Sequence, residues 1–326
     1  ADDFAFIKKQ GVFIFMGLVL MIGVSMQSLR TIRRLAVFGF LCAFAGVVLT
    51  YVVGDATKGA ARWIKFAGFS LQPSEFIKPV FIVVTAWLLD ANKRIEDFPG
   101  MTLAVGLFLL TALSVFGQPD LGMTVLISGV WALQMVWAGI PVWLIMTLFS
   151  AGLVLVTGSY FFLAHVRDRI DRFLASENEI GSQIQKSMDA FANGNLLGRG
   201  PGEGYVKMTL PDVHTDFIFA LAGEECGVWL TTIIVAAFAA IVVRSMTLSM
   251  RDNNLFVMYA ASGLAASLGG QAIVNMCSAL QLMPAKGMTL PFVSYGGSSM
   301  LASCLAMGML LAITRKNAAA EDKDNG

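Results

Sequence analysis

Long runs of apolar residues without charged side chains recur along almost the whole chain. A hydrocarbon core of roughly 30 Å is crossed by about 20 mainly apolar residues in a helix, so runs of this length predict membrane-spanning helices. The longest run, Leu121–Val166, exceeds one span and divides at Gly139-Ile140-Pro141, because proline ends a helix. The pattern predicts nine spans, at about 12–29, 35–53, 76–90, 101–117, 121–138, 142–162, 217–243, 255–280 and 297–314.

The composition agrees with this pattern. Hydrophobic residues make up 56% of the 326 positions, charged residues make up 14%, and the mean hydropathy is +0.71. A soluble fold could not bury so much apolar surface, so we predict an all-α, polytopic integral membrane helix bundle that forms a single domain over residues 1–326. The net charge of +1 indicates no strongly basic surface, so nucleic acid is not an expected partner.

Basic residues are concentrated in alternate connectors between the predicted spans. The connectors at 27–34, 90–99 and 245–254 and the tail at 317–326 would share one side, which the positive-inside rule makes cytoplasmic. Lys58, Arg62 and Lys65 in the opposite loop run against this rule. Nine spans then leave the N-terminus outside, and we expect one further helix before the first predicted span.

Two loops on the predicted outer side are long enough to carry function. Residues 55–75 form an amphipathic extracytoplasmic loop in which Trp63 could anchor at the membrane interface. Residues 163–216 form the large extracytoplasmic loop. The polar stretch Arg167–Glu225 contains most of this loop. Of the chain's charged residues, 23 basic and 22 acidic, this stretch holds 16 in total.

The most promising chemistry lies at the end of this large loop. Asp212, His214 and Asp216 alternate just before a span, so in an extended segment their side chains would share one face. They could supply a general base with an orienting partner, or bind a divalent cation through carboxylate oxygens. The alternative is a solvated loop in which Asp216 caps the next helix.

Further polar residues lie at or inside the apolar runs. Glu224 and Glu225 are predicted to face the bundle interior, because acids inside a membrane are costly. Glu75, Lys78 and Asp120 lie near membrane edges and could line a cavity between helices. The glycine-rich stretch Gly198–Gly204 lacks a preceding strand and a Walker lysine, which favours a flexible turn over a phosphate-binding loop.

The four cysteines fall in or beside apolar runs without metal-ligand spacing and are predicted to be buried free thiols: Cys42, Cys226, Cys277 and Cys304.

Four blocks of sequence together resemble one known family. They are KGAARWIKFAGFSLQPSEFIKPVF, GQPDLG, GRGPGEGYVKMTLPDVHTDFIFALAGEE and MPAKGMTLPFVSYGGSS, and they follow the order of the SEDS family (shape, elongation, division and sporulation) along nearly the whole chain. The Lys-Gly-Met-Thr stretch from Lys286 to Thr289 resembles the cell-division branch, which is FtsW-like, more than the RodA elongation branch. Members of this family usually have ten spans, and this chain begins where their second span would.

This resemblance implies a peptidoglycan glycosyltransferase that polymerises lipid II at the outer face of the bacterial cytoplasmic membrane, at the division septum. The family's catalytic aspartate falls on Asp216. Other motif residues are expected to contact substrate or support the site: His214, Trp63, Glu75, Lys78, Gln118, Asp120 and Lys286. A divalent cation, Mg²⁺ or Mn²⁺, could assist at the diphosphate.

The resemblance also implies partners. A class B penicillin-binding protein transpeptidase, FtsI-like, is expected to work with the chain, beside other divisome proteins and membrane lipid. Two other functions fit the residues: a flippase that moves lipid II across the bilayer, and a non-catalytic divisome scaffold.

Overall fold

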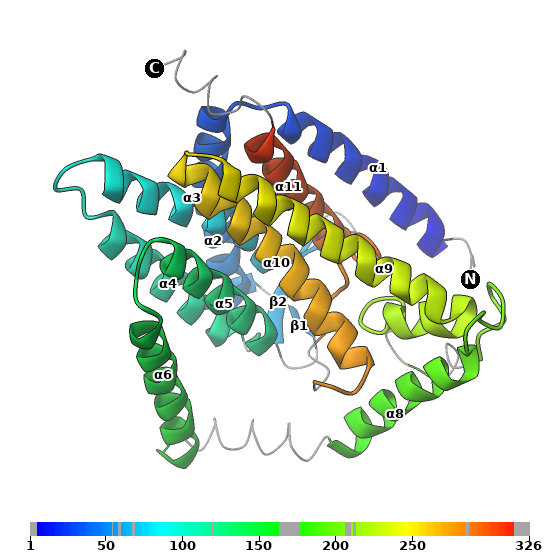
Figure 1. The fold of residues 1–326 in the computed structure, drawn as a ribbon. Helices are drawn as coiled ribbons and strands as arrows, with labels where there is room; N and C mark the ends of the chain where they lie inside the picture. The colour runs from blue at the N-terminus through cyan, green and yellow to red at the C-terminus, as the bar shows by residue number, and fades with distance from the viewer. Residues whose placement is uncertain are drawn as a thin grey trace.

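The computed structural model describes residues 5–53, 55–57, 60–66, 69–118, 120–162, 177–205, 210, 213–283 and 287–315 (Figure 1). These residues form a helical bundle with one small sheet. The helices are α1 (Ala5–Ser25), α2 (Leu29–Val53), α3 (Pro73–Arg94), α4 (Gly100–Gly117), α5 (Leu121–Trp137), α6 (Val142–Phe162), α8 (Glu177–Gly194), α9 (Ile218–Arg251), α10 (Leu255–Ala279) and α11 (Gly297–Thr314). The strands are β1 (Asp55–Thr57), β2 (Ala60–Phe66) and β3 (Phe69–Leu71).

Nine of these helices coincide with the nine predicted spans, which confirms the helical membrane bundle. Within the described residues, six helices are long and apolar enough to cross a membrane on their own: α1, α2, α4, α9, α10 and α11. The apolar helix α5 is shorter, with 17 residues. The number of helices that cross the membrane stays a prediction.

Helices α3 and α10 form the centre of the bundle. Sixteen of the 22 residues of α3 and 18 of the 25 residues of α10 are buried, against four of 18 in the peripheral helix α4. The two central helices approach closely at Gly263, where an added Cβ would lie 2.6 Å from Ile82 Cγ2. Small residues allow such close helix packing in membranes. Polar residues placed on α3 and α10 are therefore shielded from lipid.

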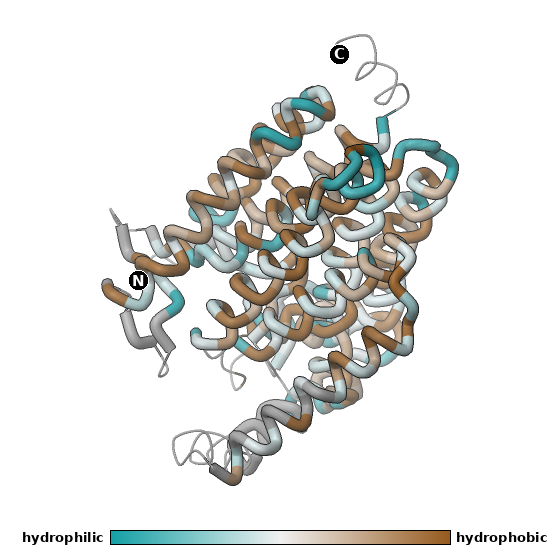
Figure 2. The backbone as a smooth tube through the Cα atoms, turned by 90° about the vertical axis from the view of Figure 1, so that its left-hand side faces the viewer, coloured by the Kyte–Doolittle hydropathy of each residue, from teal (hydrophilic) through white to brown (hydrophobic). Residues whose placement is uncertain are grey.

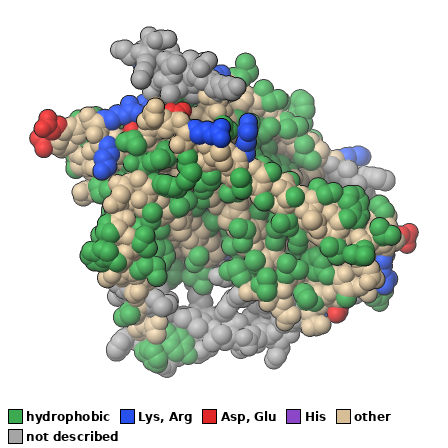
Figure 3. Space-filling view, in the orientation of Figure 1, with side chains coloured by type: hydrophobic (Ala, Val, Ile, Leu, Met, Phe, Trp, Pro, Cys, Tyr) green, Lys and Arg blue, Asp and Glu red, His purple; other side chains and the backbone are tan. Residues whose placement is uncertain are grey.

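The outer surface of the bundle is apolar. Large side chains such as Phe15, Phe38 and Leu113 are more than two-thirds exposed, and Figure 3 shows hydrophobic side chains spread over the body of the molecule. Such a surface is far larger than the apolar patches that soluble monomers expose, and it suits lipid. All four cysteines are free thiols, as predicted, but only Cys304 is buried, and Cys42 is exposed.

Polar connectors gather at one end of the bundle (Figure 2). Arg94 Nε donates to Asp90 Oδ1 at 2.8 Å, and Arg94 Nη2 donates to Asn254 Oδ1 at 2.9 Å, which joins the connector after α3 to the connector before α10. The Arg33 guanidinium lies 4.3 Å from the ring centre of Phe256. The basic connectors thus share one end, as predicted. The tail at 317–326 lies outside the described residues.

The opposite end contains a departure from the all-α prediction, a small sheet among the described residues. The three strands form an antiparallel sheet in the order β1-β2-β3, with Trp63 opposite Asp55 and Ile64 opposite Leu71. The strand β2 is rich in aromatic and β-branched residues compared with the flanking loops, and such residues favour strands. Periodicity over so short a segment did not separate a strand from an amphipathic loop.

The helix predicted at 217–243 is present as α9, but it is not continuous. Gly227 has φ 79° and ψ −176°, which interrupts the helix ten residues from its start. The segment after α8 packs into this break: Arg199 N donates to Glu224 O, Gly200 N donates to Glu225 O, and Val228 N donates to Asn195 O. The Gly198–Gly204 stretch, predicted to be a flexible turn, begins with this docked segment. The backbone groups released by the break thereby regain hydrogen-bond partners.

Candidate functional site

Asp216 lies in a turn immediately before α9, at the end of the bundle that carries the sheet. Its side chain is half-buried. Asn275 Nδ2 on α10 donates to the backbone carbonyl of Asp216 at 2.9 Å and also to Met288 O at 2.7 Å. Gly287 has φ 62°, and a Cβ added there would lie 3.5 Å from Asp216 Oδ2. The aspartate is therefore held between α10 and the segment that follows it.

The condition under which Asp212, His214 and Asp216 would share one face, an extended segment, is not met at residues 213–216. Residues 213–216 form turns, in which side chains do not alternate across two faces. The side chain of His214 is exposed, while its carbonyl accepts a hydrogen bond from Tyr295 N at 2.8 Å. Asp212 lies outside the described residues. The turn packs against the loop before α11, where Ser294 and Tyr295 donate hydrogen bonds to its carbonyls. These two residues lie about 80 positions away in the sequence, so the local pattern could not predict the turn.

Glu75 and Lys78 form a buried ion pair in the first turns of α3. Lys78 Nζ lies 2.8 Å from Glu75 Oε2, and the two residues are 4% and 7% exposed. Lys78 Nζ also donates to Gln271 Oε1 on α10 at 2.6 Å. A buried charge is tolerated only when it is paired and hydrogen-bonded, and both conditions hold here.

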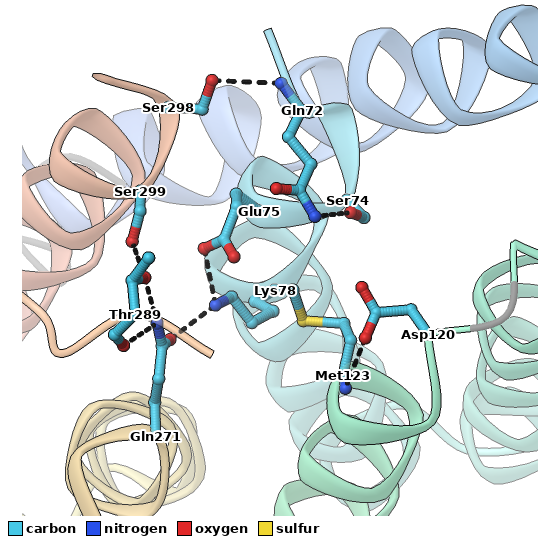
Figure 4. A network of polar contacts seen from close by, with 10 residues as sticks. All are labelled: Gln72, Ser74, Glu75, Lys78, Asp120, Met123, Gln271, Thr289, Ser298 and Ser299. Atoms are coloured by element: carbon cyan, nitrogen blue, oxygen red, sulfur yellow. Dashed lines mark hydrogen bonds and ion pairs between the residues drawn. The ribbon is translucent and has the colours of Figure 1, made fainter. Parts of the chain in front are cut away.

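The ion pair connects to the loop between α10 and α11. Gln271 Nε2 donates to Thr289 O at 3.0 Å, and the hydroxyls of Thr289 and Ser299 lie 2.5 Å apart. Figure 4 shows Glu75, Lys78, Gln271, Thr289 and Ser299 as one connected line of contacts. Thr289, within this line, lies two residues from Gly287, at which an added Cβ would lie 3.5 Å from Asp216 Oδ2.

One face of α10 joins this network to Asp216. Gln271 and Asn275 are four residues apart, so they lie on the same face in successive turns. Gln271 Nε2 donates to Thr289 O and Asn275 Nδ2 donates to Met288 O, so the two contacts together fix the segment at 287–290. Asp216 and the Glu75–Lys78 pair are thus positioned by the same surface of a buried helix.

Asp120 and Gln118 belong to a second cluster around Arg62 of β2. Arg62 Nη1 lies 3.4 Å from Asp120 Oδ2, and Arg62 Nε donates to Gln118 O at 2.9 Å. Asp120 also caps α5 by accepting from Met123 N at 3.1 Å. The Gln118 side chain turns toward α2, where it donates to Thr50 Oγ1. This cluster fastens the sheet to the start of α5.

The remaining predicted residues have other positions. Trp63 lies on β2 next to Arg62 and is partly exposed. Lys286 lies outside the described residues. Glu224 is fully buried, as predicted for an acid inside the bundle, and its Oε1 accepts from Tyr205 N at 3.0 Å, whereas Glu225 is only partly buried. Glu224 therefore holds the segment that docks onto the break in α9.

A divalent cation has no ligand set in the described part of the chain. No three His, Cys, Asp or Glu side chains gather there in a group that could hold a metal ion.

Several residues of the site escaped sequence reasoning. Asn275, Thr289 and Ser294 connect the segments around Asp216, and Ser294 Oγ donates to Thr215 O at 2.5 Å. Gln271 on α10 links the Glu75–Lys78 pair to Thr289. The available signal was the pair of amide side chains at 271 and 275 within one apolar span, since polar residues inside membrane helices mark functional interiors.

Comparison with known proteins decides the family. Residues 1–319 match the family model of cell cycle proteins that covers FtsW, RodA and SpoVE. This chain belongs to that family.

Its relatives share most of their length with it. A protein of Caulobacter vibrioides, named probable peptidoglycan glycosyltransferase FtsW, is 42% identical over 315 residues, which cover 97% of this chain and 81% of the relative. A protein of Geobacter metallireducens with the same name is 37% identical and covers 97% of this chain and 86% of its own length.

Two solved structures share the fold. One comes from work on the structural coordination of polymerization and crosslinking by a peptidoglycan synthase complex, with a TM-score of 0.80, 26% identity, and coverage of 96% of this chain and 90% of that chain. The other is the rod shape determining protein RodA of Thermus thermophilus, with a TM-score of 0.71, 25% identity, and coverage of 97% and 89%.

Proposed function

We propose that this FtsW-like protein is a peptidoglycan glycosyltransferase, which polymerises lipid II into glycan strands with Asp216 as the general base. The names of the relatives and the helical membrane bundle support the glycosyltransferase activity. The observation that carries the role of Asp216 is its position: a half-buried carboxylate at one end of an apolar bundle, tied through Asn275 to the central helix α10.

The chemistry follows from the substrate. Lipid II carries its sugar on a diphosphate joined to a polyprenyl tail, so the tail stays in the bilayer while the sugar reaches the end of the bundle. Asp216 removes the proton from the acceptor's 4-hydroxyl as its oxygen attacks the anomeric carbon of the donor. The diphosphate leaves with inversion at that carbon, and the proton resides on Asp216. General-base assistance of this kind is typically worth about 10²–10⁴-fold in rate.

The Glu75–Lys78 pair and its partners position the site. Lys78 donates to Glu75 and Gln271, and Gln271 in turn donates to Thr289. Lys78 therefore orders the segment at 287–290 beside Asp216. A positive charge near this segment would also stabilise the negative charge that develops on the leaving diphosphate. Lys286, which directly precedes the ordered segment, is a second source of positive charge in this proposal.

We place the reaction at the outer face of the bacterial cytoplasmic membrane, at the division septum. The basic connectors at the opposite end support a cytoplasmic location for that end. A solved relative belongs to a complex that coordinates polymerization and crosslinking. A class B penicillin-binding protein, which crosslinks the strands, is the corresponding partner for this chain, beside other divisome proteins.

The test is polymerisation of lipid II by the purified protein together with its cognate transpeptidase. Asp216→Asn should lower the rate by about 10²-fold or more, because the amide cannot accept the proton. Asp189→Asn is the matched control, since Asp189 is an exposed carboxylate on α8 and its loss leaves the site unchanged. Polymerisation at the wild-type rate by Asp216→Asn would overturn the assignment.

The same assay separates the two alternative functions. Lipid II is supplied in detergent or on the outer face of vesicles, so no transport is needed before polymerisation. A flippase would form no polymer under these conditions. A scaffold would form none from its own site, and Asp216→Asn would leave the partner's output unchanged.

A further inference from the structure

A pocket of about 510 Å³ opens between α2 and α3 at the basic end of the bundle, away from Asp216. Its lining combines three arginines with four apolar residues: Arg30, Arg33, Arg34, Val37, Phe38, Leu41 and Trp87. No acidic side chain is among these seven residues. A pocket of this size lies within the range of small-ligand sites, and its charge selects an anion.

The arginines and the apolar residues occupy separate parts of the pocket. Arg30, Arg33 and Arg34 lie in the first turns of α2, at the end that holds the basic connectors. Phe38 and Leu41 follow one and two turns further along the helix and are 68% and 62% exposed. The pocket is therefore cationic at its rim and apolar along the part that faces lipid.

The apolar part of the pocket continues from the arginines toward the middle of the bundle. Leu41 follows Arg34 by seven residues, which corresponds to about 10 Å along a helix. This length lies within half of a hydrocarbon core of roughly 30 Å. A ligand that contacts both parts must carry an anionic group and an apolar chain that extends about 10 Å from it.

The position of Arg33 is fixed by its neighbours. Its guanidinium lies over the Phe256 ring, 4.3 Å from the ring centre, and Arg33 shares an electrostatic interaction with Asp90, whose Oδ1 lies 2.8 Å from Arg94 Nε. Arg30 and Arg34 are exposed at the rim. Planar guanidinium groups bind phosphate oxygens through paired donors, so this end of the pocket suits a phosphodiester.

We propose that this pocket binds an anionic phospholipid of the cytoplasmic leaflet, with its phosphate at the arginines of α2 and one acyl chain along Phe38, Leu41 and Trp87. Basic pockets between membrane helices on the cytoplasmic side bind anionic headgroups in this way. The site is separate from the proposed polymerisation site and does not depend on that function.

Trp87 provides a direct readout. The protein is placed in nanodiscs of phosphatidylcholine, and brominated phosphatidylglycerol or brominated phosphatidylcholine is added in increasing proportion. Bromine quenches tryptophan on contact, and the Trp87 contribution is the difference between the wild type and Trp87→Phe. Phosphatidylglycerol should quench this contribution at a much lower proportion than phosphatidylcholine.

The double variant Arg30→Gln/Arg34→Gln tests the charge. In this variant, quenching of Trp87 should need an about 30-fold higher proportion of brominated phosphatidylglycerol. The reason is that each basic residue near the surface contributes roughly 1 kcal/mol to anionic lipid binding. Arg244→Gln/Arg251→Gln is the matched control. It removes two exposed arginines from the C-terminal part of α9, and neither of them lines the pocket. The wild-type comparison of the two lipids decides the proposal even where a variant does not fold.

Three results would overturn the proposal. The first is equal quenching by the two brominated lipids. The second is an equal loss in the control variant, which would indicate general surface charge. The third is displacement of the lipid by inorganic phosphate or by a polyprenyl diphosphate, which would assign the pocket to a soluble anion or to a carrier lipid.

Discussion

Asn275 donates hydrogen bonds from one amide nitrogen to the carbonyls of Asp216 and Met288, at 2.9 and 2.7 Å. Two segments more than 70 residues apart are thereby joined at a buried position of α10. The side chain of Asn275 is 1% exposed, so water does not compete for these bonds. The placement of the proposed catalytic carboxylate therefore depends on a buried residue of α10 that binds its backbone.

The first prediction concerns this contact. Asn275→Ala removes both donors, leaves two carbonyls unpaired and frees Asp216 to shift. We expect polymerisation to fall about 10²-fold, because small displacements of a catalytic group have effects of that size. The measurement is the rate of glycan polymerisation from lipid II, with Asn253→Ala as the control at an exposed position near the opposite end. An unchanged rate would contradict the positioning role.

The second prediction concerns the buried ion pair. Lys78→Met leaves the Glu75 carboxylate buried without its cation, which typically costs about 3–5 kcal/mol. Glu75→Gln/Lys78→Met removes both charges and should restore much of the thermal stability. The measurement is the unfolding temperature of the purified protein in detergent. A double variant less stable than Lys78→Met would show that the pair does not behave as a coupled unit.

The third prediction concerns the break in α9. A Cβ at Gly227 would lie 2.3 Å from Leu196 O, and its φ of 79° is strained for any other residue. Gly227→Ala should therefore destabilise the protein by about 2 kcal/mol or more. Gly129→Ala in α5 is the matched control, because nothing lies within 4 Å of the added methyl group there. Similar unfolding temperatures for the two variants would argue against the docked segment.

The fourth prediction concerns orientation in the membrane. In a variant without the native cysteines, Leu197→Cys should react with a membrane-impermeant maleimide in sealed right-side-out vesicles. Glu96→Cys, in the basic connector after α3, should react only after the vesicles are opened. Both positions are exposed, so access to the reagent depends on sidedness alone. The reverse labelling pattern would place Asp216 on the cytoplasmic side.

The sequence by itself determined the helical membrane bundle. Apolar runs of about 20 residues are local features, and lipid forces their backbone groups to pair within each helix. The basic connectors at one end were equally local. The resemblance in four motif blocks pointed to the family and to Asp216, Glu75 and Lys78 before any contact was known.

Only the tertiary structure decided how these residues are arranged. The turn at 213–216 and the break at Gly227 involve contacts with segments far away in the sequence, which periodicity does not record. The sheet of β1, β2 and β3 is local, but its strands are too short for periodicity to identify. Gln271 and Asn275 read as ordinary polar residues in an apolar helix until α3, α9 and the 287–290 segment pack around them. Local patterns specify each helix, whereas buried hydrogen bonds and ion pairs between helices specify the site.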